Sequence, residues 1–412
     1  MFLQPYRVLD LTDAQGFLCG KLLADLGADV VKVEPPGGDP TRDFPPFYMG
    51  ESDPERSLYW WAYNSNKRGI TLDIERAEGR RILERLVASA DILVESYPPG
   101  YLDNLGLGYE DLAKIRTELV MVSISPFGQT GPHAGYRSSD LIAMAMGGIM
   151  YISGDPDRAP VRVSYPQAYL HGGAEAAVGC MMAILERERS GHGQQVDTSI
   201  QESLISTAVA SPVTWDITGE VMPRRGATRS RGTGRVAYRQ LWPCLDGHVF
   251  FTRLYGVGMN AAMRSMVAWM EEEGAEAGVL SAMEWENFDF DAISQERADE
   301  IFEPIQRFFS AKTKAELFDG ALARRILIYP VSDMQDLLKD RQLQVRNVFQ
   351  KVEHPELGAL VTYPVEYMKI HPYPIEVRRR APLIGEHNEE VYLHELGLSP
   401  AEFEALQRDT VI

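Results

Sequence analysis

A segment rich in arginine and glycine offers the clearest means of binding an anionic group. Residues 223–234 hold four arginines among three glycines: Arg224, Arg225, Arg229 and Arg231, with Gly226, Gly232 and Gly234. Guanidinium groups pair with carboxylates or phosphates in a bidentate way, and glycine lets a loop turn tightly around a ligand. The same composition is typical of a solvated surface loop, and both interpretations stay open at this point.

His171 is a second candidate, because it stands directly before Gly172 and Gly173 at the start of a predicted helix. An imidazole there is able to act as a base near an anionic ligand held at the helix N-terminus. It is equally able to pack in the core, as most such histidines do.

Metal and redox chemistry find no support in the sequence. Cys19, Cys180 and Cys244 show no paired spacing, and no two of the eight histidines stand three or four residues apart. Neither a zinc site nor a disulfide framework is therefore expected. No G-x-G-x-x-G follows the first predicted strand, and G-x-x-x-x-G-K-[ST] is absent. We accordingly expect no metal, nicotinamide or flavin.

The overall charge restricts the partners. With 41 Lys and Arg against 59 Asp and Glu, the 412-residue chain has a formal net charge of −18. Such a surface repels nucleic acids and anionic membranes, so neither is an expected partner. The start, MFLQPYRVLDLTD, lacks the basic and apolar regions of a signal peptide, and no uninterrupted apolar run approaches the roughly 20 residues of a membrane span. A cytoplasmic protein is expected.

The elements that must position these groups alternate between strands and helices. The patterns predict strands at 7–11, 28–34, 69–73, 91–95 and 119–124, with helices at 17–26 and 77–88. This alternation indicates a parallel sheet with helices on both faces. Ligands of such sheets bind beyond the carboxyl ends of the strands, and the turns at 37–39 and 99–100 fall at that edge.

The remainder of the chain follows a different pattern. A long helix is predicted at 168–187, rich in small residues that let another backbone approach closely. After the arginine-rich segment, two strands flank the turn dipeptide Asp246-Gly247, and 259–314 is mostly helical by period. Short strands follow from about residue 325, and a helical tail begins at Glu389.

Several segments together resemble one protein family. They are RVLDL, LLADLGADVVKVEPPGGD, NKRGITLD, GRRILERLVASADILVESYPPGYLDNLGLGYEDL, LVMVSISPFGQTGP, DLIAMAMGGIMYISGDPDRAPVRV, ERERSGHGQQVDTSIQESL and APLIGEHNEEVYLHELGLS. In this order, from about residue 6 onward, they resemble the class III CoA-transferases, the CaiB/BaiF group.

The resemblance implies both fold and assembly. It implies an α/β fold with a large CoA-binding domain, built on a Rossmann-like parallel sheet, at 1–220 and 326–412. A smaller α+β domain at 221–325 would begin with the Arg/Gly-rich loop. Two chains would intertwine as an interlocked dimer, with each active site between protomers.

The resemblance also implies a mechanism from which this chain departs. In that family an acidic side chain attacks a CoA thioester, forms a mixed anhydride, and passes CoA to an incoming carboxylate through an aspartyl-CoA thioester. The family pattern V-x-V-x-x-x-x-x-D begins here at Val161 and Val163 and places Tyr169 where the nucleophilic Asp belongs. A phenol, with a pKa of about 10, cannot form the same anhydride. Unless another carboxylate serves, this chain alone should not transfer CoA by that route.

Two nearby carboxylates are the possible substitutes. Glu175 lies almost two turns into the predicted helix and faces away from Tyr169 by helical period. Asp140 follows Ser138 and Ser139, and we expect it to cap the helix that begins LIAMAM.

By the resemblance, a set of residues would contact CoA. Leu72, Asp73 and Ile74 would line the adenine, and Ser96 and Tyr97 stand where the family commonly has Asn-Phe. Asn104 takes a place often held by Arg, and Arg137 matches a frequently basic position. The family's glycine-rich lid corresponds to Arg231, Gly232, Gly234 and Arg235.

The leading hypothesis is an Asp-less subunit that pairs with a related Asp-bearing subunit, as in the succinyl-CoA:benzylsuccinate CoA-transferases. The pair, a heterodimer or heterotetramer, would move CoA from succinyl-CoA to a dicarboxylate, and the arginine-rich loop would hold the second carboxylate. One alternative is a homodimeric CoA-thioester isomerase, lyase or hydrolase in which Tyr169 or His171 moves a proton. Another is a non-catalytic protein that binds CoA thioesters.

Overall fold

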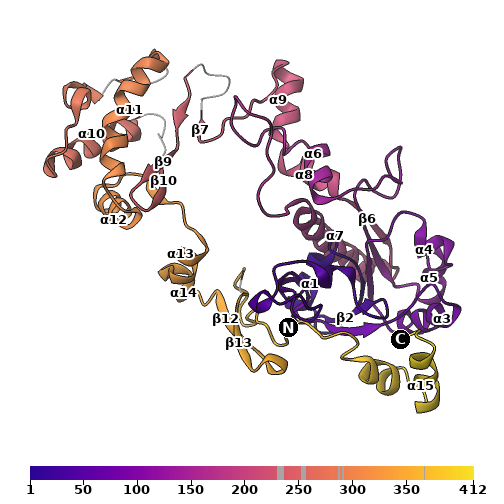
Figure 1. Cartoon of the computed structure of the whole chain (residues 1–412). Helices are drawn as coiled ribbons and strands as arrows, with labels where there is room; N and C mark the ends of the chain where they lie inside the picture. The colour runs from indigo at the N-terminus through magenta and orange to yellow at the C-terminus, as the bar shows by residue number, and fades with distance from the viewer. Residues whose placement is uncertain (230–235, 252–256, 286–287, 290–291, 366) are drawn as a thin grey trace. The chain divides into compact units, whose positions relative to one another are not determined.

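The computed structural model describes residues 1–229, 236–251, 257–285, 288–289, 292–365 and 367–412 (Figure 1). By internal contacts the chain divides into two compact units. The larger comprises 1–150, 162–210 and 341–412, and the smaller comprises 151–161 and 211–340.

Compared with the predicted small domain at 221–325, the smaller unit also includes 151–161, 211–220 and 326–340. The Gly226 N–H donates to the Gly154 carbonyl, which attaches 151–161 to the smaller unit. The strand β11, Ile328–Pro330, pairs with β10, Gly247–Phe251, and keeps the residues just after 325 in the smaller unit as well.

A six-stranded sheet forms the centre of the larger unit, in the order β3-β2-β1-β4-β5-β6, and every neighbouring pair is parallel. Its strands are β1 Arg7–Leu11, β2 Asp29–Glu34, β3 Arg68–Thr71, β4 Ile92–Glu95, β5 Val120–Ser125 and β6 Gln195–Ser199. The prediction of a parallel sheet is confirmed. The order reverses between β1 and β4, which is the position where ligands bind in sheets of this type. β6 escaped prediction because QVDTS is short and mostly polar.

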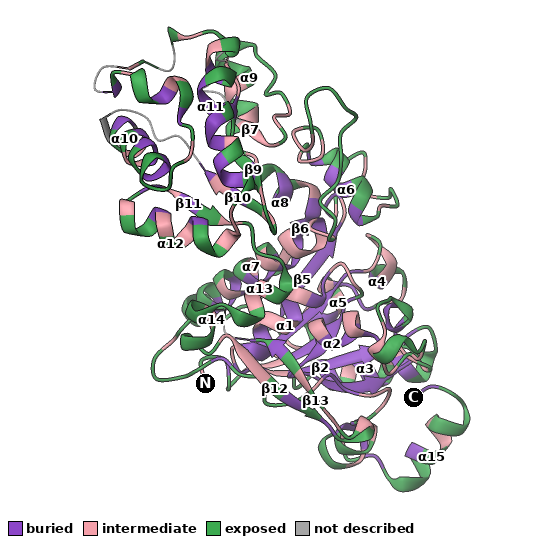
Figure 2. Cartoon of the chain, turned by 60° about the vertical axis from the view of Figure 1, so that its left-hand side comes forward, coloured by how far each residue is buried: buried purple, intermediate pink, exposed green. Residues whose placement is uncertain are grey.

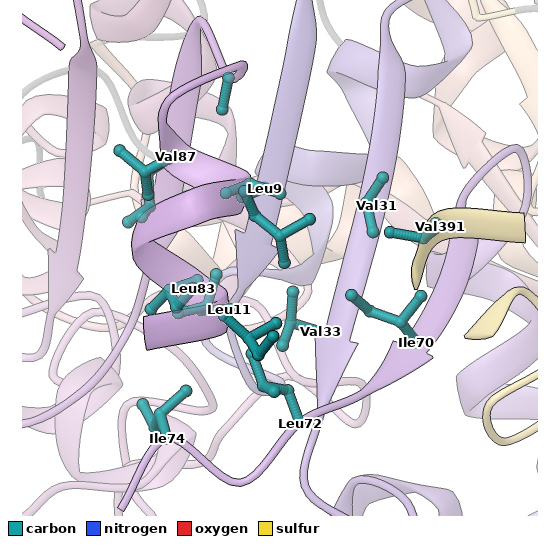
Figure 3. Close-up of a cluster of buried hydrophobic side chains, with 14 of the residues drawn as sticks. Leu9, Leu11, Val31, Val33, Ile70, Leu72, Ile74, Leu83, Val87 and Val391 are labelled. Carbon is teal, nitrogen blue, oxygen red and sulfur yellow. The ribbon is translucent and has the colours of Figure 1, made fainter. Parts of the chain in front are cut away.

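Helices and a hairpin complete the larger unit. They are α1 Phe17–Asp25, α2 Leu58–Asn64, α3 Ala77–Val87, α4 Tyr101–Asn104, α5 Tyr109–Ile115, α6 Asp140–Met146, α7 Ala168–Ser190, α8 Ile200–Thr207, α14 Arg341–Val345 and α15 Pro400–Arg408, with β12 Phe349–His354 and β13 Ala359–Pro364. The strands β1 to β5 are almost entirely buried (Figure 2), whereas the edge strand β6 exposes Gln195 and Asp197. On one face, apolar side chains of β1, β2 and β3 pack against Leu83 and Val87 of α3 and against Val391 (Figure 3).

α7 packs as a core helix against α1, β5 and β6. A Cβ added at Gly173 would lie 3.2 Å from the Cys19 backbone nitrogen, so the predicted close approach of another backbone is confirmed. By length and composition α7 could also cross a membrane, although the sequence shows no uninterrupted apolar run of that length. Of its most apolar window, 44% is buried inside the protein.

The C-terminal segment closes the β3 edge of the sheet. The predicted helical tail from Glu389 starts as a π-helix, Glu389–Glu395, and α15 follows it. Arg68 of β3, whose side chain is 7% exposed, pairs with Asp29 at 2.6 Å, Glu390 at 2.8 Å and Glu395 at 2.5 Å. One buried guanidinium thereby joins two strands to a segment more than 300 residues later in the chain.

The smaller unit combines a three-stranded antiparallel sheet with helices. Its elements are α9 Ala210–Thr218, which starts in the larger unit, β7 Thr228–Arg229, β8 Tyr238–Arg239, β9 Leu241–Cys244, β10, β11, α10 Val257–Glu272, α11 Gln295–Ser310, α12 Lys314–Arg324 and α13 Met334–Lys339. The turn predicted at Asp246-Gly247 is confirmed, because Cys244 of β9 pairs with Gly247 of β10. Trp242, Trp269 and Phe309 are buried in its core.

Candidate active site

A cavity of about 1220 Å³ lies in the larger unit, beyond the carboxyl ends of β1, β2, β3 and β4. Six of the seven residues expected to contact CoA line it: Leu72, Asp73, Ile74, Ser96, Tyr97 and Arg137. The two turns expected at this edge contribute Gly37, Asp39 and Pro99. Asn104 does not line the cavity; it is exposed at the end of α4.

The apolar part of the cavity is built by residues that also belong to the core. Leu72 and Ile74 follow β3 directly, and their side chains are 2% and 6% exposed. The rings of Tyr97 and Tyr101, which also line the cavity, stack with their centroids 4.7 Å apart and pack against the same apolar cluster. The Tyr101 hydroxyl donates to Glu75 at 3.0 Å, which orients that ring. Such an apolar and aromatic surface suits a flat ring system.

Asp13 connects β1 with β4 where the strand order reverses. Its backbone N–H donates to the Ser96 hydroxyl at 2.8 Å, and that hydroxyl donates to the Asp13 carboxylate at 2.9 Å. Asp13 lines the cavity, yet the sequence analysis missed it. Its position just after the first strand of a parallel sheet was the available signal.

Tyr169 lies in the first turn of α7, half-buried against the core. Burial raises the pKa of its phenol to about 12, and the carboxylates of Asp13 and Asp140 act in the same direction. The Asp140 backbone N–H, which hydrogen-bonds the phenol oxygen, acts against them. The phenol therefore faces two carboxylates and stays neutral at pH 7.

Asp140 has a different task from the one predicted. Ser139, not Asp140, caps α6, because the Ser139 hydroxyl accepts from the Ile142 N–H. The Asp140 carboxylate instead accepts from the Ala168 N–H at 2.7 Å and satisfies the N-terminus of α7. It reaches a neighbouring helix because the two N-termini meet, a tertiary contact that local capping rules do not predict. Asp140 thus holds Tyr169 in place.

The structure does not bring the other predicted catalytic side chains, His171 and Glu175, to the lining of the cavity. The Nδ1 atom of His171 lies 3.1 Å from the hydroxyl of Thr207 on α8. Glu175 is exposed on α7 and does not line the cavity. Arg231, Gly232, Gly234 and Arg235 lie outside the described residues. Within the described ranges, no group of three or more His, Cys, Asp and Glu side chains could hold a metal ion.

Among the residues that the structure describes, two cations line the cavity, and they differ in their surroundings. Lys32 is 1% exposed, and its ammonium donates to the carbonyls of Asp10 and Thr12 at 3.3 and 2.5 Å. It is therefore committed to the backbone. Arg137 is exposed and has no acidic partner among the residues that the structure describes.

Comparison with known proteins agrees with this architecture. Residues 3–388 match the family described as CoA-transferase family III. Succinyl-CoA:(R)-benzylsuccinate CoA-transferase subunit BbsE of Thauera aromatica is 37% identical over 98% of this chain and 96% of the relative. The succinyl-CoA–L-malate CoA-transferase beta subunit of Chloroflexus aurantiacus is 29% identical over 98% and 97%.

A solved structure of similar fold covers nearly the whole chain. The CAIB/BAIF family protein from Brucella suis superposes with a TM-score of 0.82 at 25% identity, covering 96% of this chain and 99% of that protein. The parallel sheet, the cavity at its reversal point and the match along residues 3–388 are consistent with one assignment. The chain belongs to CoA-transferase family III, the CaiB/BaiF group.

Proposed function

We propose that this chain is the Asp-less subunit of a heteromeric class III CoA-transferase and pairs with a related subunit that bears the nucleophilic Asp. The observation that carries the proposal is Tyr169, a phenol at the family's nucleophile position, seated at the N-terminus of α7. With a pKa of about 12, roughly one phenol in 10⁵ is ionised at pH 7. An aryl ester would also form from it, in place of a mixed anhydride.

The carboxylates around Tyr169 do not replace the missing nucleophile. Asp140 accepts the Ala168 N–H, and Asp13 accepts from Ser96 and from the Gln15 N–H. Both are held by the backbone around them, which favours a positioning role. The attacking carboxylate would accordingly come from the partner, in an interlocked dimer whose active site lies between the two chains.

The identity of the substrates is proposed from the names of the relatives and not from any single side chain of this protein. Two of them are named as subunits, one with benzylsuccinate and one with L-malate as acceptor, and both with succinyl-CoA. We therefore propose succinyl-CoA as the donor and a dicarboxylate such as benzylsuccinate as the acceptor. Arg231 and Arg235 would hold the acceptor's second carboxylate by bidentate pairing.

Expression of this chain alone, and together with the Asp-bearing family member of its source organism, tests the proposal. Native mass and succinyl-CoA-dependent transfer to a panel of dicarboxylates are measured for both preparations. We expect activity only in the mixed preparation, with a mass that fits two different subunits. Full activity of this chain alone would refute the proposal.

A further inference from the structure

The cavity has the size for CoA but not the charge. CoA carries an adenine ring and three phosphate groups, with roughly four negative charges at neutral pH. The adenine fits the apolar wall of Leu72, Ile74 and Tyr97. The phosphates must be met by cations or by free backbone N–H groups, since the net charge of the protein is −18.

Five carboxylates line the cavity within the described part of the chain, and two of them have cationic partners. Glu34 forms a bidentate pair with Arg42, at 2.7 and 2.8 Å, and both side chains are almost fully buried. Asp73 lies 3.3 Å from the Arg76 guanidinium. These two carboxylates are therefore largely neutralised.

The other three carboxylates are Asp13, Asp39 and Glu75. Asp13 accepts from Ser96, Asp39 accepts from the Thr41 N–H and hydroxyl, and Glu75 accepts from Tyr101. All these donors are neutral. None of the three carboxylates has a cationic partner among the described residues.

The cations do not compensate for these charges. Lys32 is committed to carbonyl groups and faces the buried Asp10 carboxylate at 3.9 Å. Only Arg137, among the described lining residues, remains to meet a phosphate. A concave surface lined mainly by one sign of charge concentrates its field and lowers the local concentration of like-charged ligands.

From this mismatch we infer that the cavity of this subunit does not retain CoA, and that the heteromeric enzyme binds CoA once per pair of subunits, in the partner's cavity. The inference rests on the proposed function, because it assigns CoA to the other chain of that pair. The cavity here has an apolar wall that suits adenine, but its described lining carries more carboxylates than cations.

The experiment counts CoA on the mixed enzyme by equilibrium dialysis with radiolabelled CoA, and repeats the titration on this chain alone. We expect one CoA per pair and no saturable binding to the isolated chain. Two CoA per pair, or saturable micromolar binding to this chain alone, would overturn the inference.

A variant tests whether charge is the cause. Asp73→Asn with Glu75→Lys raises the charge at the cavity by three and leaves the apolar wall intact. We expect saturable CoA binding to the variant at concentrations at which the unchanged chain shows none, with bound CoA at least tenfold higher at equal free CoA. The matched control is Glu78→Lys with Glu110→Gln, because both residues are exposed and lie outside the cavity.

Each outcome of the variant experiment decides the question. No gain of binding in the cavity variant, or an equal gain in the control, would overturn the electrostatic explanation.

Salt adds an independent test. Residual, non-saturable binding of CoA to the unchanged chain should strengthen between 50 and 500 mM NaCl, because the Debye length falls about threefold over that range. Weaker binding at high salt would contradict repulsion. Activity of this chain alone would refute the proposed pairing, yet binding to the isolated chain would still be measurable.

Discussion

Glu95 provides a quantitative test of the electrostatics of the sheet edge. It is the last residue of β4, it is 4% exposed, and it directly precedes Ser96 and Tyr97 of the cavity. Burial raises the pKa of its carboxyl from 4.5 to about 7. The carboxylates of Asp103 and Asp197 add to the rise, while hydrogen bonds from Ser123 and from the Tyr97 N–H oppose it.

The sign of the effect follows from linkage. Because the folded-state pKa lies above the unfolded value, folding is favoured while Glu95 is protonated, and this stability is lost as the pH rises from 4.5 through 7. At about 1.36 kcal/mol per pKa unit, the full cost above pH 7 is about 3.4 kcal/mol. At pH 5.5 the cost is only about 1.4 kcal/mol, because the unfolded chain alone is ionised there.

Glu95→Gln removes this cost and keeps an oxygen to accept the Tyr97 N–H. The variant should therefore unfold at higher urea than the unchanged chain. Its gain in free energy of unfolding should grow by about 2 kcal/mol between pH 5.5 and pH 8.5. The assay is urea unfolding followed by tryptophan fluorescence at both pH values, with exposed Glu110→Gln as the control. A gain independent of pH, or a loss of stability at pH 8.5, would refute the assignment of a raised pKa to Glu95.

Four further predictions follow. Tyr169→Phe should leave kcat of the mixed enzyme within about threefold, because the phenol is neutral and the proposed mechanism takes its nucleophile from the partner; a hundredfold loss in the transfer assay would give the hydroxyl a chemical role. Arg42→Met should cost about 3–5 kcal/mol in urea unfolding, because it leaves the buried Glu34 carboxylate unpaired. Adding Glu34→Gln should recover most of that loss, and an additive double variant would contradict the pairing. Arg231→Ala should raise the KM for a dicarboxylate acceptor but not for a monocarboxylate; equal effects on both would remove the proposed clamp. Gly173→Val should cost more than about 2 kcal/mol by thermal unfolding, because its Cβ would meet Leu18 at 2.9 Å; an unchanged Tm would contradict that contact.

The parallel sheet was predictable because β1, β2, β4 and β5 are short segments rich in apolar residues and separated by helices or turns. β4 and β5 are fully buried, and β1 and β2 are buried apart from their first residues. β6 was missed because an edge strand with exposed Gln195 and Asp197 has no such run. A continuous apolar run indicates burial on both faces of a strand. β6 lacks that burial, whereas β3 at the opposite edge is covered by the C-terminal segment and is fully buried.

The site was predictable in part. The residues that line the cavity at 72–74 and 96–97 follow strands, so their place at the sheet edge follows from the strand assignment. The role of Asp140 did not follow, because its hydrogen bond reaches Ala168, 28 residues later. A contact between two helix N-termini depends on how the helices pack, and no local pattern encodes it.

The Arg68 cluster has a consequence for synthesis on the ribosome. The Arg68 guanidinium on β3 cannot form all its ion pairs until Glu390 and Glu395 have left the exit tunnel. These two residues supply two of its three acidic partners. The inserted unit, whose main stretch is the continuous segment 211–340, is by then already synthesised and is free to fold first. At a synthesis rate of roughly 5–20 residues per second, the β3 edge of the sheet remains uncovered for tens of seconds before these late residues are made. In the heteromer that we propose, that interval is when the chain is best able to interlock with its partner subunit.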